Sequence, residues 1–332
     1  DIRDASPLLE VELEVTNTCN LRCRHCFISF SEDFFPFNLF EKVITQARNL
    51  GAISLTLNGG EATLHPQFME MVEKTVQAGL RARLFTNGCT ITSEKAKLLK
   101  QAGLSRAYVS LETFQEFHDW LRGPGTWEKA KTGTEALIAA GVEVVANPTI
   151  TWRNLHLMDS FQKFALEELK VTSVSFGVAT PMGMGAKNWE EVSLPIEDYP
   201  KVFELARDIR ALPEGRCPLS CKAGVNQLFV GAQGDVYPCH LFADQKFSFG
   251  NMINDNMSLE DIYRGETPAH RQFREFPHDE MKDCGACSKK EKCGGGCRAR
   301  GLLIGGDLLG KDPVACARFL GVPIRVSGCE RC

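Results

Sequence analysis

Several features that would point to particular protein classes are missing from this chain. No apolar stretch approaches the roughly 18 residues that a membrane-spanning helix needs, and there is no signal peptide at its start. Basic residues are not in excess, since 38 Lys and Arg face 42 Asp and Glu and the net charge is −4. The sequence therefore predicts neither a membrane protein nor a nucleic-acid-binding one, and we expect a cytoplasmic location.

Nucleotide-binding glycine motifs are absent as well. No Gly-x-Gly-x-x-Gly follows a strand-like run, which disfavours a nicotinamide dinucleotide site. The glycine run 294–296 lies between Cys293 and Cys297 and is not a phosphate-binding loop. There is also no internal repeat and no low-complexity tract. What remains is an ordinary globular composition, 43% hydrophobic and 24% charged over 332 residues, which is long enough for two domains.

Cysteine is abundant. Of the 14 cysteines, three lie close to the start, Cys89 stands alone, and the others all follow position 216. A disulfide scaffold explains this poorly, because such scaffolds are small and loop-rich and this chain has long periodic segments. In a reducing compartment, clustered cysteines are more often metal ligands. We therefore expect metal centres in a protein that needs anoxic or protected conditions.

Residues 8 to about 195 alternate between short strand-like and amphipathic helix-like segments. We expect strands at 8–15, 53–57, 81–86, 106–112, 142–149 and 171–178, and helices at about 39–50, 66–79, 93–102, 126–140 and 157–168. Repeated βα units predict a parallel sheet with right-handed crossovers. Six strands are too few for a closed eight-stranded barrel, so the expected fold class is α/β with a partial (β/α)6 barrel.

Polar residues recur on one face of several expected strands. In the fourth, Ser110 and Glu112 share a face while Val109 and Leu111 share the other. If the apolar pair packs on the helices, the polar pair points into the lumen, where an unpaired group costs about 1–3 kcal/mol. A polar ligand inside the barrel would satisfy these groups. The alternative is a water-filled mouth whose polar residues pair with one another.

The composition changes after a segment bounded by prolines. We expect a linking helix from Ile196 to Leu212, between Pro195 and Pro213. Beyond it Gly and Cys become frequent and helical periodicity weakens. The expected domains are a barrel at 1–195, a linker at 196–216 and a Cys-rich domain with little regular structure at 217–332.

The first cysteine trio, Cys19-x3-Cys23-x2-Cys26, lies in a short loop directly after the first expected strand. Three thiolates can hold three irons of a [4Fe–4S] cluster and leave the fourth iron open to a substrate or cofactor. A structural zinc site is the alternative, but it normally takes four ligands. No fourth Cys lies nearby, and His25 would crowd the donors. The trio therefore favours a cluster.

This spacing resembles the signature of the radical S-adenosylmethionine (SAM) superfamily, whose fold is a partial barrel. The resemblance extends to Gly59, Gly60 and Glu61 at the end of the second expected strand, where relatives contact the amino group of SAM. It implies SAM as a cofactor, with further contacts from His25, Asn87, Ser110, Glu112 and Asn147. The last three are equally explained as lumen residues that satisfy one another. Cys89, which follows Gly88, is a candidate hydrogen-atom donor or, more simply, a small apolar filler.

The later cysteines resemble the seven-cysteine signature of SPASM domains. By that pattern a first auxiliary [4Fe–4S] cluster would use Cys217, Cys221, Cys239 and Cys297, and a second would use Cys284, Cys287, Cys293 and Cys316. Together with the first trio, this implies three [4Fe–4S] clusters. Zinc is the alternative at Cys284-x2-Cys287. Cys329 and Cys332 form a further ligand pair, a redox dithiol or a tail without a role.

The resemblance implies a SPASM-type radical SAM enzyme, an oxidoreductase that reductively cleaves SAM to a 5′-deoxyadenosyl radical and removes hydrogen from a substrate. The leading expectation is a ribosomally synthesised peptide (RiPP) that receives an oxidative crosslink or a similar modification, with a flavodoxin or ferredoxin as electron donor. The alternatives are a tetrapyrrole substrate, as in haem synthesis, a peptide epimerase, a non-catalytic iron–sulfur electron carrier and a zinc-binding interaction module.

Many peptide-modifying relatives carry an N-terminal leader-binding domain. Here the chain has no initiator Met, and only about seven residues precede the first expected strand. We therefore expect one of four situations: a separate protein presents the peptide, its leader binds elsewhere, a segment has been removed, or the substrate has no leader.

Overall fold

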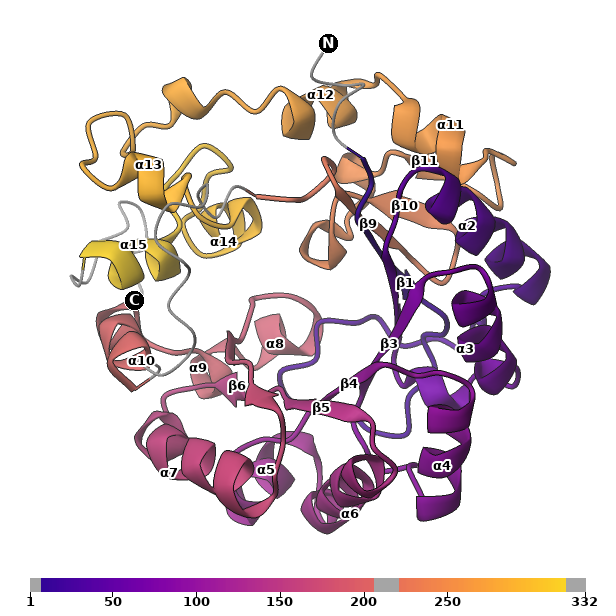
Figure 1. The fold of residues 1–332 in the computed structure, drawn as a ribbon. Coiled ribbons are helices and arrows are strands. Elements are labelled where there is room, and N and C mark those ends of the chain that lie inside the picture. Colours follow the sequence, from indigo (N-terminus) through magenta and orange to yellow (C-terminus); the bar gives the residue numbers. More distant parts are fainter. Residues whose placement is uncertain (1–6, 206–220, 321–332) are drawn as a thin grey trace.

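A nine-stranded sheet is the frame of the structure, a computed structural model that describes residues 7–205 and 221–320 (Figure 1). Its first six strands, all parallel, have the order β1 (Glu10–Glu14), β2 (Ser54–Asn58), β3 (Arg81–Thr86), β4 (Arg106–Val109), β5 (Glu143–Ala146) and β7 (Ser173–Val174). A separate small sheet pairs β6 (Thr149–Ile150) with β8 (Gly177–Val178). The open, parallel arrangement confirms the expected partial α/β barrel.

Helices connect the strands and lie along the outside of the sheet (Figure 1). They are α2 (Phe37–Asn49), α3 (Phe68–Gln77), α4 (Ser93–Gln101), α5 (Gln115–Arg122), α6 (Thr126–Ala139) and α7 (Met158–Lys163), the last continued by a π-helical turn at Phe164–Glu168. The apolar periodicity predicts all of them except α5. That helix is short, and two of its four buried positions carry His118 and Arg122 instead of apolar side chains.

Alternation along the strands separates an apolar outer face from a polar lumen. The outer positions are fully buried against the helices, as at Val11, Leu13, Leu55 and Leu57. On the lumen face Glu10 pairs with Arg83 (2.9 Å), and Arg106 pairs with Glu143 (2.7 Å). The lumen is therefore polar, as the strand pattern predicts, and these charges neutralise one another.

The Cys-rich region continues the same sheet. β9 (Gln227–Val230) pairs in parallel with β1, and β10 (Asp235–Tyr237) and β11 (Gly250–Asn251) follow in antiparallel order. After them come the short helices α11 (Leu259–Arg264), α12 (Pro268–Arg274), α13 (Lys290–Cys293), α14 (Arg298–Leu303) and α15 (Pro313–Leu320). Strand pairing thus fixes the position of the start of this region relative to the barrel.

The segment that leads out of the barrel contains α8 (Gly183–Lys187), α9 (Trp189–Val192), a 3₁₀ turn at Ile196–Asp198 and α10 (Tyr199–Leu205). Tyr199 and Val202 of α10 belong to the same apolar cluster as Val314 and Ala317 of α15, so the two helices pack together (Figure 1). The rest of the expected linking helix, Cys217, Cys329 and Cys332 lie outside the described residues. Within the described ranges, no helix has the length and apolar character to cross a membrane.

Candidate iron–sulfur and SAM site

The loop after β1 brings the first three cysteines together. Cys23 is buried and Cys19 and Cys26 are half-buried. Burial is the main cause that raises the pKa of Cys26 to about 11, and the nearby thiols of Cys19 and Cys23 add to it. Within residues 7–205 and 221–320, no three Cys, His, Asp or Glu side chains surround a single ion position. A cluster needs a wider spacing, because each thiolate binds its own iron, and three neighbouring thiols are a fitting donor set for it.

Gly59 and Gly60 hold this loop against the end of β2. The N–H of Gly60 donates to the carbonyl oxygen of Thr16 (2.8 Å), and the N–H of Glu61 donates to that of Thr18 (2.9 Å). A Cβ on Gly60 would stand 2.4 Å from the Thr18 oxygen, and a Cβ on Gly59 would stand 2.4 Å from the Thr16 oxygen. Because these glycines lack a Cβ, the backbone leading into the chain's own cysteine loop can lie directly against them. Their contact with SAM stays a prediction.

A second glycine segment, which the sequence reasoning missed, supports the same loop from the other side. The N–H groups of Met184 and Gly185 donate to the carbonyl oxygen of Cys26 (2.7 and 3.2 Å). A Cβ on Gly183 would stand 2.7 Å from that oxygen, and a Cβ on Gly185 would stand 3.1 Å from the carbonyl oxygen of His25. In the sequence, this contact was signalled only by the Gly183-x-Gly185 motif, which follows the last expected strand.

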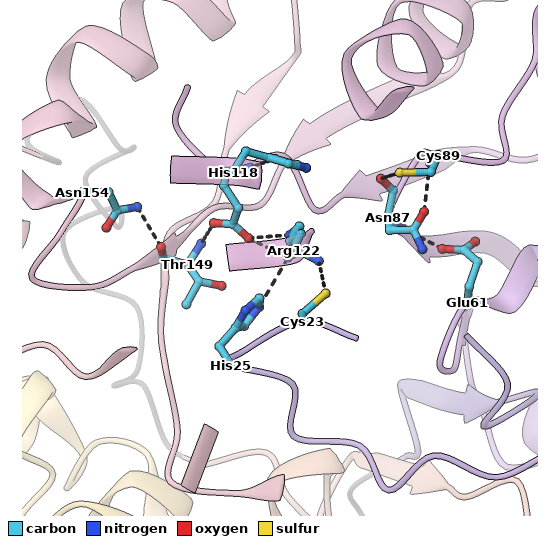
Figure 2. A network of polar contacts seen from close by, with 10 residues as sticks. Cys23, His25, Glu61, Asn87, Cys89, His118, Arg122, Thr149 and Asn154 are labelled. Carbon is cyan, nitrogen blue, oxygen red and sulfur yellow. Dashed lines mark hydrogen bonds and ion pairs between the residues drawn. The ribbon is translucent and has the colours of Figure 1, made fainter. Parts of the chain in front are cut away.

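The carboxylate of Glu61 is buried and is occupied by protein donors. Thr63 Oγ1 (2.6 Å), Thr86 Oγ1 (2.8 Å) and the N–H of Asn87 (2.7 Å) all donate to it. Nδ2 of Asn87 in turn donates to Oδ1 of Asn20 in the cysteine loop (2.9 Å). The bond between Glu61 and Asn87 is drawn in Figure 2. Together with the Asn87–Asn20 bond, it ties the ends of β2 and β3 to the loop. These bonds give Glu61 a positioning role, and its contact with SAM stays a prediction.

A buried ion pair lies beside Cys23 (Figure 2). Nε and Nη2 of Arg122 both donate to Oε1 of Glu112 (2.8 and 2.6 Å), and the N–H of Thr149 donates to Oε2 (2.7 Å). The same guanidinium lies 3.8 Å from the Cys23 sulfur and 3.4 Å from Nε2 of His25. Arg122 thus joins the end of β4, α5 and the cysteine loop.

This arrangement fixes the charge states around the loop. Although burial opposes its charge, the Glu112 carboxylate raises the pKa of Arg122 above its ordinary value. Burial, followed by the Arg122 charge, lowers the pKa of His118 to about 3, and its Nδ1 accepts a hydrogen bond from the N–H of Glu112 (3.1 Å). The same two causes hold the pKa of His25 well below its ordinary value. Both histidines are therefore neutral beside one fixed cation.

The residues expected to contact SAM differ in how deeply they are buried. Ser110 and Asn147 are half-buried at the ends of β4 and β5. Glu112 is instead fully buried and paired, which favours the alternative of lumen groups that satisfy one another, and its contact with SAM stays a prediction. Arg122 and His118 were missed. A short helix could have been found from the apolar pair Phe117 and Leu121, four residues apart and just before Gly123. His118 and Arg122 each follow one of these apolar residues and are buried with them.

Cys89 lies after the end of β3, near the same site (Figure 2). Its sulfur stands 3.8 Å from the carbonyl oxygen of Asn87 and 3.7 Å from that of Thr126. It is half-buried and packs against the apolar core, and burial raises the pKa of its thiol to about 11. The thiol is therefore protonated at neutral pH, and the contacts suit an apolar filler.

The later cysteines gather in two groups. In the first, the thiols of Cys221 and Cys297 act electrostatically on Cys239, whose pKa burial raises well above its ordinary value. The second group lines a cavity of about 250 Å³ and contains Cys284, Cys287, Cys293 and Cys316. These groups match the two sets that the resemblance implied, apart from Cys217. Their role as cluster ligands stays a prediction.

Family models match both parts of the chain. Residues 13–159 match the radical SAM superfamily, and residues 221–288 match the SPASM iron–sulfur cluster-binding domain. The chain belongs to the radical SAM superfamily. As a radical SAM enzyme with a SPASM domain, it uses SAM and iron–sulfur clusters.

Characterised radical SAM proteins align with almost the whole chain. An AdoMet-dependent heme synthase of Oleidesulfovibrio alaskensis is 27% identical over 94% of this chain and 88% of its own length. The mycofactocin maturase MftC of Mycobacterium ulcerans is 28% identical over 93% and 88%, and the PqqA peptide cyclase of Methylocella silvestris is 28% identical over 91% and 85%. Among solved structures, native anSMEcpe with bound AdoMet has the same fold, with a TM-score of 0.77 at 20% identity over 94% and 96% of the two chains.

Proposed function

We propose that this radical SAM enzyme oxidatively modifies a ribosomally synthesised peptide, forming a crosslink or a similar bond. The observation that carries the proposal is the alignment with a maturase and a peptide cyclase over more than nine-tenths of the chain. A flavodoxin or ferredoxin is the proposed electron donor.

The first site would hold a [4Fe–4S] cluster on Cys19, Cys23 and Cys26, with SAM on its open iron. When bound, these groups supply a 5′-deoxyadenosyl radical that removes a hydrogen atom from an unactivated carbon. Burial raises the pKa of the Cys23 thiol, and the fixed positive charge of Arg122 beside it is the strongest influence in the opposite direction, toward the thiolate that iron requires.

The second region would hold two further [4Fe–4S] clusters, which brings the number to three. Cys221, Cys239 and Cys297, together with Cys217, would ligate the first, and the cavity cysteines would ligate the second. A modification that removes two hydrogens from a peptide releases one electron beyond the abstracted hydrogen atom. The auxiliary clusters are the proposed acceptors of that electron.

A tetrapyrrole substrate is the second candidate, because the heme synthase aligns equally well. Tetrapyrroles of haem synthesis carry several carboxylates, so their site needs cations that are not already neutralised. In the described part of the lumen, Arg83, Arg106 and Arg122 each pair with a glutamate. These three arginines therefore supply no free positive charge for a polyacid.

The test is to incubate the reconstituted chain with SAM, a reductant and the peptide encoded beside its gene. We expect 5′-deoxyadenosine and a peptide lighter by two hydrogens. Replacing Cys19, Cys23 and Cys26 with Ala should abolish both products and leave the auxiliary iron in place. Iron-loaded protein that forms no 5′-deoxyadenosine would indicate an electron carrier, colourless protein with zinc would indicate an interaction module, and a modified tetrapyrrole would favour the second candidate.

A further inference from the structure

Arg298 is a fully buried cation next to the second cysteine group. Its side chain is 1% exposed and is the largest of the fully buried side chains. Nη1 donates to the carbonyl oxygens of Leu308 (3.0 Å) and Gly310 (2.8 Å), and the guanidinium carbon lies 5.4 Å from the centre of the Phe276 ring. Nε and Nη2 are also buried and have no hydrogen-bond partner within the described residues. Two of its three nitrogens therefore lack an acceptor there.

Two other arginines, the buried Arg122 and the half-buried Arg300, are neutralised. Arg122 pairs with Glu112 at 2.6 Å, and Arg300, in the same helix α14 as Arg298, pairs with Asp312 at 2.7 Å. Among residues 7–205 and 221–320, no carboxylate forms an ion pair with Arg298. A buried charge without a counter-ion costs several kcal/mol. The site therefore needs an anion.

The second cysteine group lies close to the guanidinium. Cys284, Cys287, Cys293 and Cys316 line the 250 Å³ cavity together with Gly295. A Cβ on Gly295 would stand 3.5 Å from Nη2 of Arg298, so the unpartnered nitrogen borders the cavity wall. Burial raises the pKa of the Cys284 thiol, and the Arg298 charge is the strongest influence in the opposite direction. Helices α13, α14 and α15, which carry or border these residues, lie close together in the C-terminal region (Figure 1).

We propose that Arg298 is the counter-ion of the second auxiliary cluster, with Nη2, one of its two unpartnered nitrogens, donating to it. This role rests on the proposed function, which assigns the four cavity cysteines to that cluster. A [4Fe–4S] cluster held by four thiolates is an anion, and reduction adds one negative charge. A fixed cation in a low-dielectric site stabilises the reduced form more than the oxidised form. Arg298 therefore raises the reduction potential of this cluster.

The test is a redox titration of the reconstituted full chain, followed by electron paramagnetic resonance. In Arg298→Met, which replaces the cation with an apolar side chain of similar length, one auxiliary midpoint should move to lower potential. We expect the ratio of reduced to oxidised cluster at a fixed potential to fall about tenfold, which corresponds to about 59 mV. Arg298→Lys keeps the positive charge, so its midpoint potential should stay close to that of the native chain. Lys282→Met, which removes a 72% exposed cation, should leave every midpoint unchanged.

Iron content distinguishes a charge effect from a packing effect. Selective iron loss in Arg298→Met but not in Arg298→Lys would also support the proposal. Equal iron loss in both variants, or unchanged midpoints in fully loaded Arg298→Met, would overturn the proposal. Either result would mean that the positive charge does not act on the cluster and that Arg298 only binds the carbonyl oxygens of Leu308 and Gly310. Zinc in place of iron at the cavity cysteines would instead refute the cluster assignment, so metal analysis separates the two failures.

Discussion

Oε1 of Glu112 lies 2.6 Å from Nη2 of Arg122, and neither side chain is more than 9% exposed. The pair links the end of β4 to α5, and its cation lies against Cys23 in the cysteine loop. A buried ion pair of this kind contributes little net stability, but removing one partner leaves an uncompensated charge. Its value to this protein is that it fixes a positive charge at the cluster loop.

Arg122→Ala should destabilise the chain strongly. We expect the free energy of unfolding to fall by about 3–5 kcal/mol, because Glu112 remains buried without its partner. The double change Glu112→Gln with Arg122→Met leaves no buried charge and should recover much of this loss. Urea unfolding of the iron-free chains measures both. Equal destabilisation by the single and double changes would contradict the ion-pair account.

Gly60→Ala should displace the cysteine loop. Its Cβ would stand 2.4 Å from the carbonyl oxygen of Thr18, a contact that backbone cannot tolerate without moving. We expect loss of the SAM-binding cluster and of 5′-deoxyadenosine formation, with auxiliary iron retained. Gly177→Ala is the matched control, because a Cβ there meets nothing within 4 Å. Iron analysis and chromatography of the reaction products check the pair, and a fully active Gly60→Ala enzyme would be the contrary result.

His118 should make the stability of the chain depend on pH. Its pKa is about 3 in the folded chain against an ordinary value of 6.5, with burial the main cause. Between these values the unfolded chain binds a proton that the folded chain excludes. The stabilising contribution is therefore complete above about pH 6.5 and is lost as the pH falls toward 3, by at most roughly 4–5 kcal/mol.

His118→Asn tests this dependence, because its side-chain oxygen can still accept from the N–H of Glu112 and does not titrate. Urea unfolding of the iron-free chains from pH 7 to pH 4 should show a smaller decline in the variant than in the native chain. The control is His156→Asn at an exposed histidine, which should leave the decline in stability the same as in the native chain. Parallel pH profiles for native and His118→Asn chains would contradict the prediction.

Cys89→Ala should leave the product unchanged. The half-buried thiol packs against the core and lies near two backbone carbonyls. We therefore expect the peptide product and the yield of 5′-deoxyadenosine to match those of the native enzyme within about twofold, since one small side chain replaces another. Mass spectrometry of reactions in deuterated water is the measurement. Deuterium uptake at a peptide carbon that disappears in Cys89→Ala would instead identify Cys89 as a hydrogen-atom donor and the reaction as an epimerisation.

The strand pattern predicted the barrel well because its outer face is apolar at every second residue, as in Val11 and Leu13. α5 could not be predicted in the same way, since His118 and Arg122 occupy positions that are normally apolar. Their burial is possible only because Glu112, on a different element, supplies a counter-charge and an N–H donor. A pattern read along one segment does not show such a partner.

Cysteine spacing, with the Gly59-Gly60-Glu61 motif, carried the resemblance to the family, since three thiols within eight residues limit the metal chemistry that they can perform. Tertiary structure decided which neighbours those thiols have. It set the glycine contacts that hold the loop, the carboxylate of Glu61 that faces inward, and the two arginines whose positive charges are buried near cysteines. The physical reason is that ligand type is a local property of the chain, whereas electrostatic environment depends on residues far apart in sequence that folding brings together.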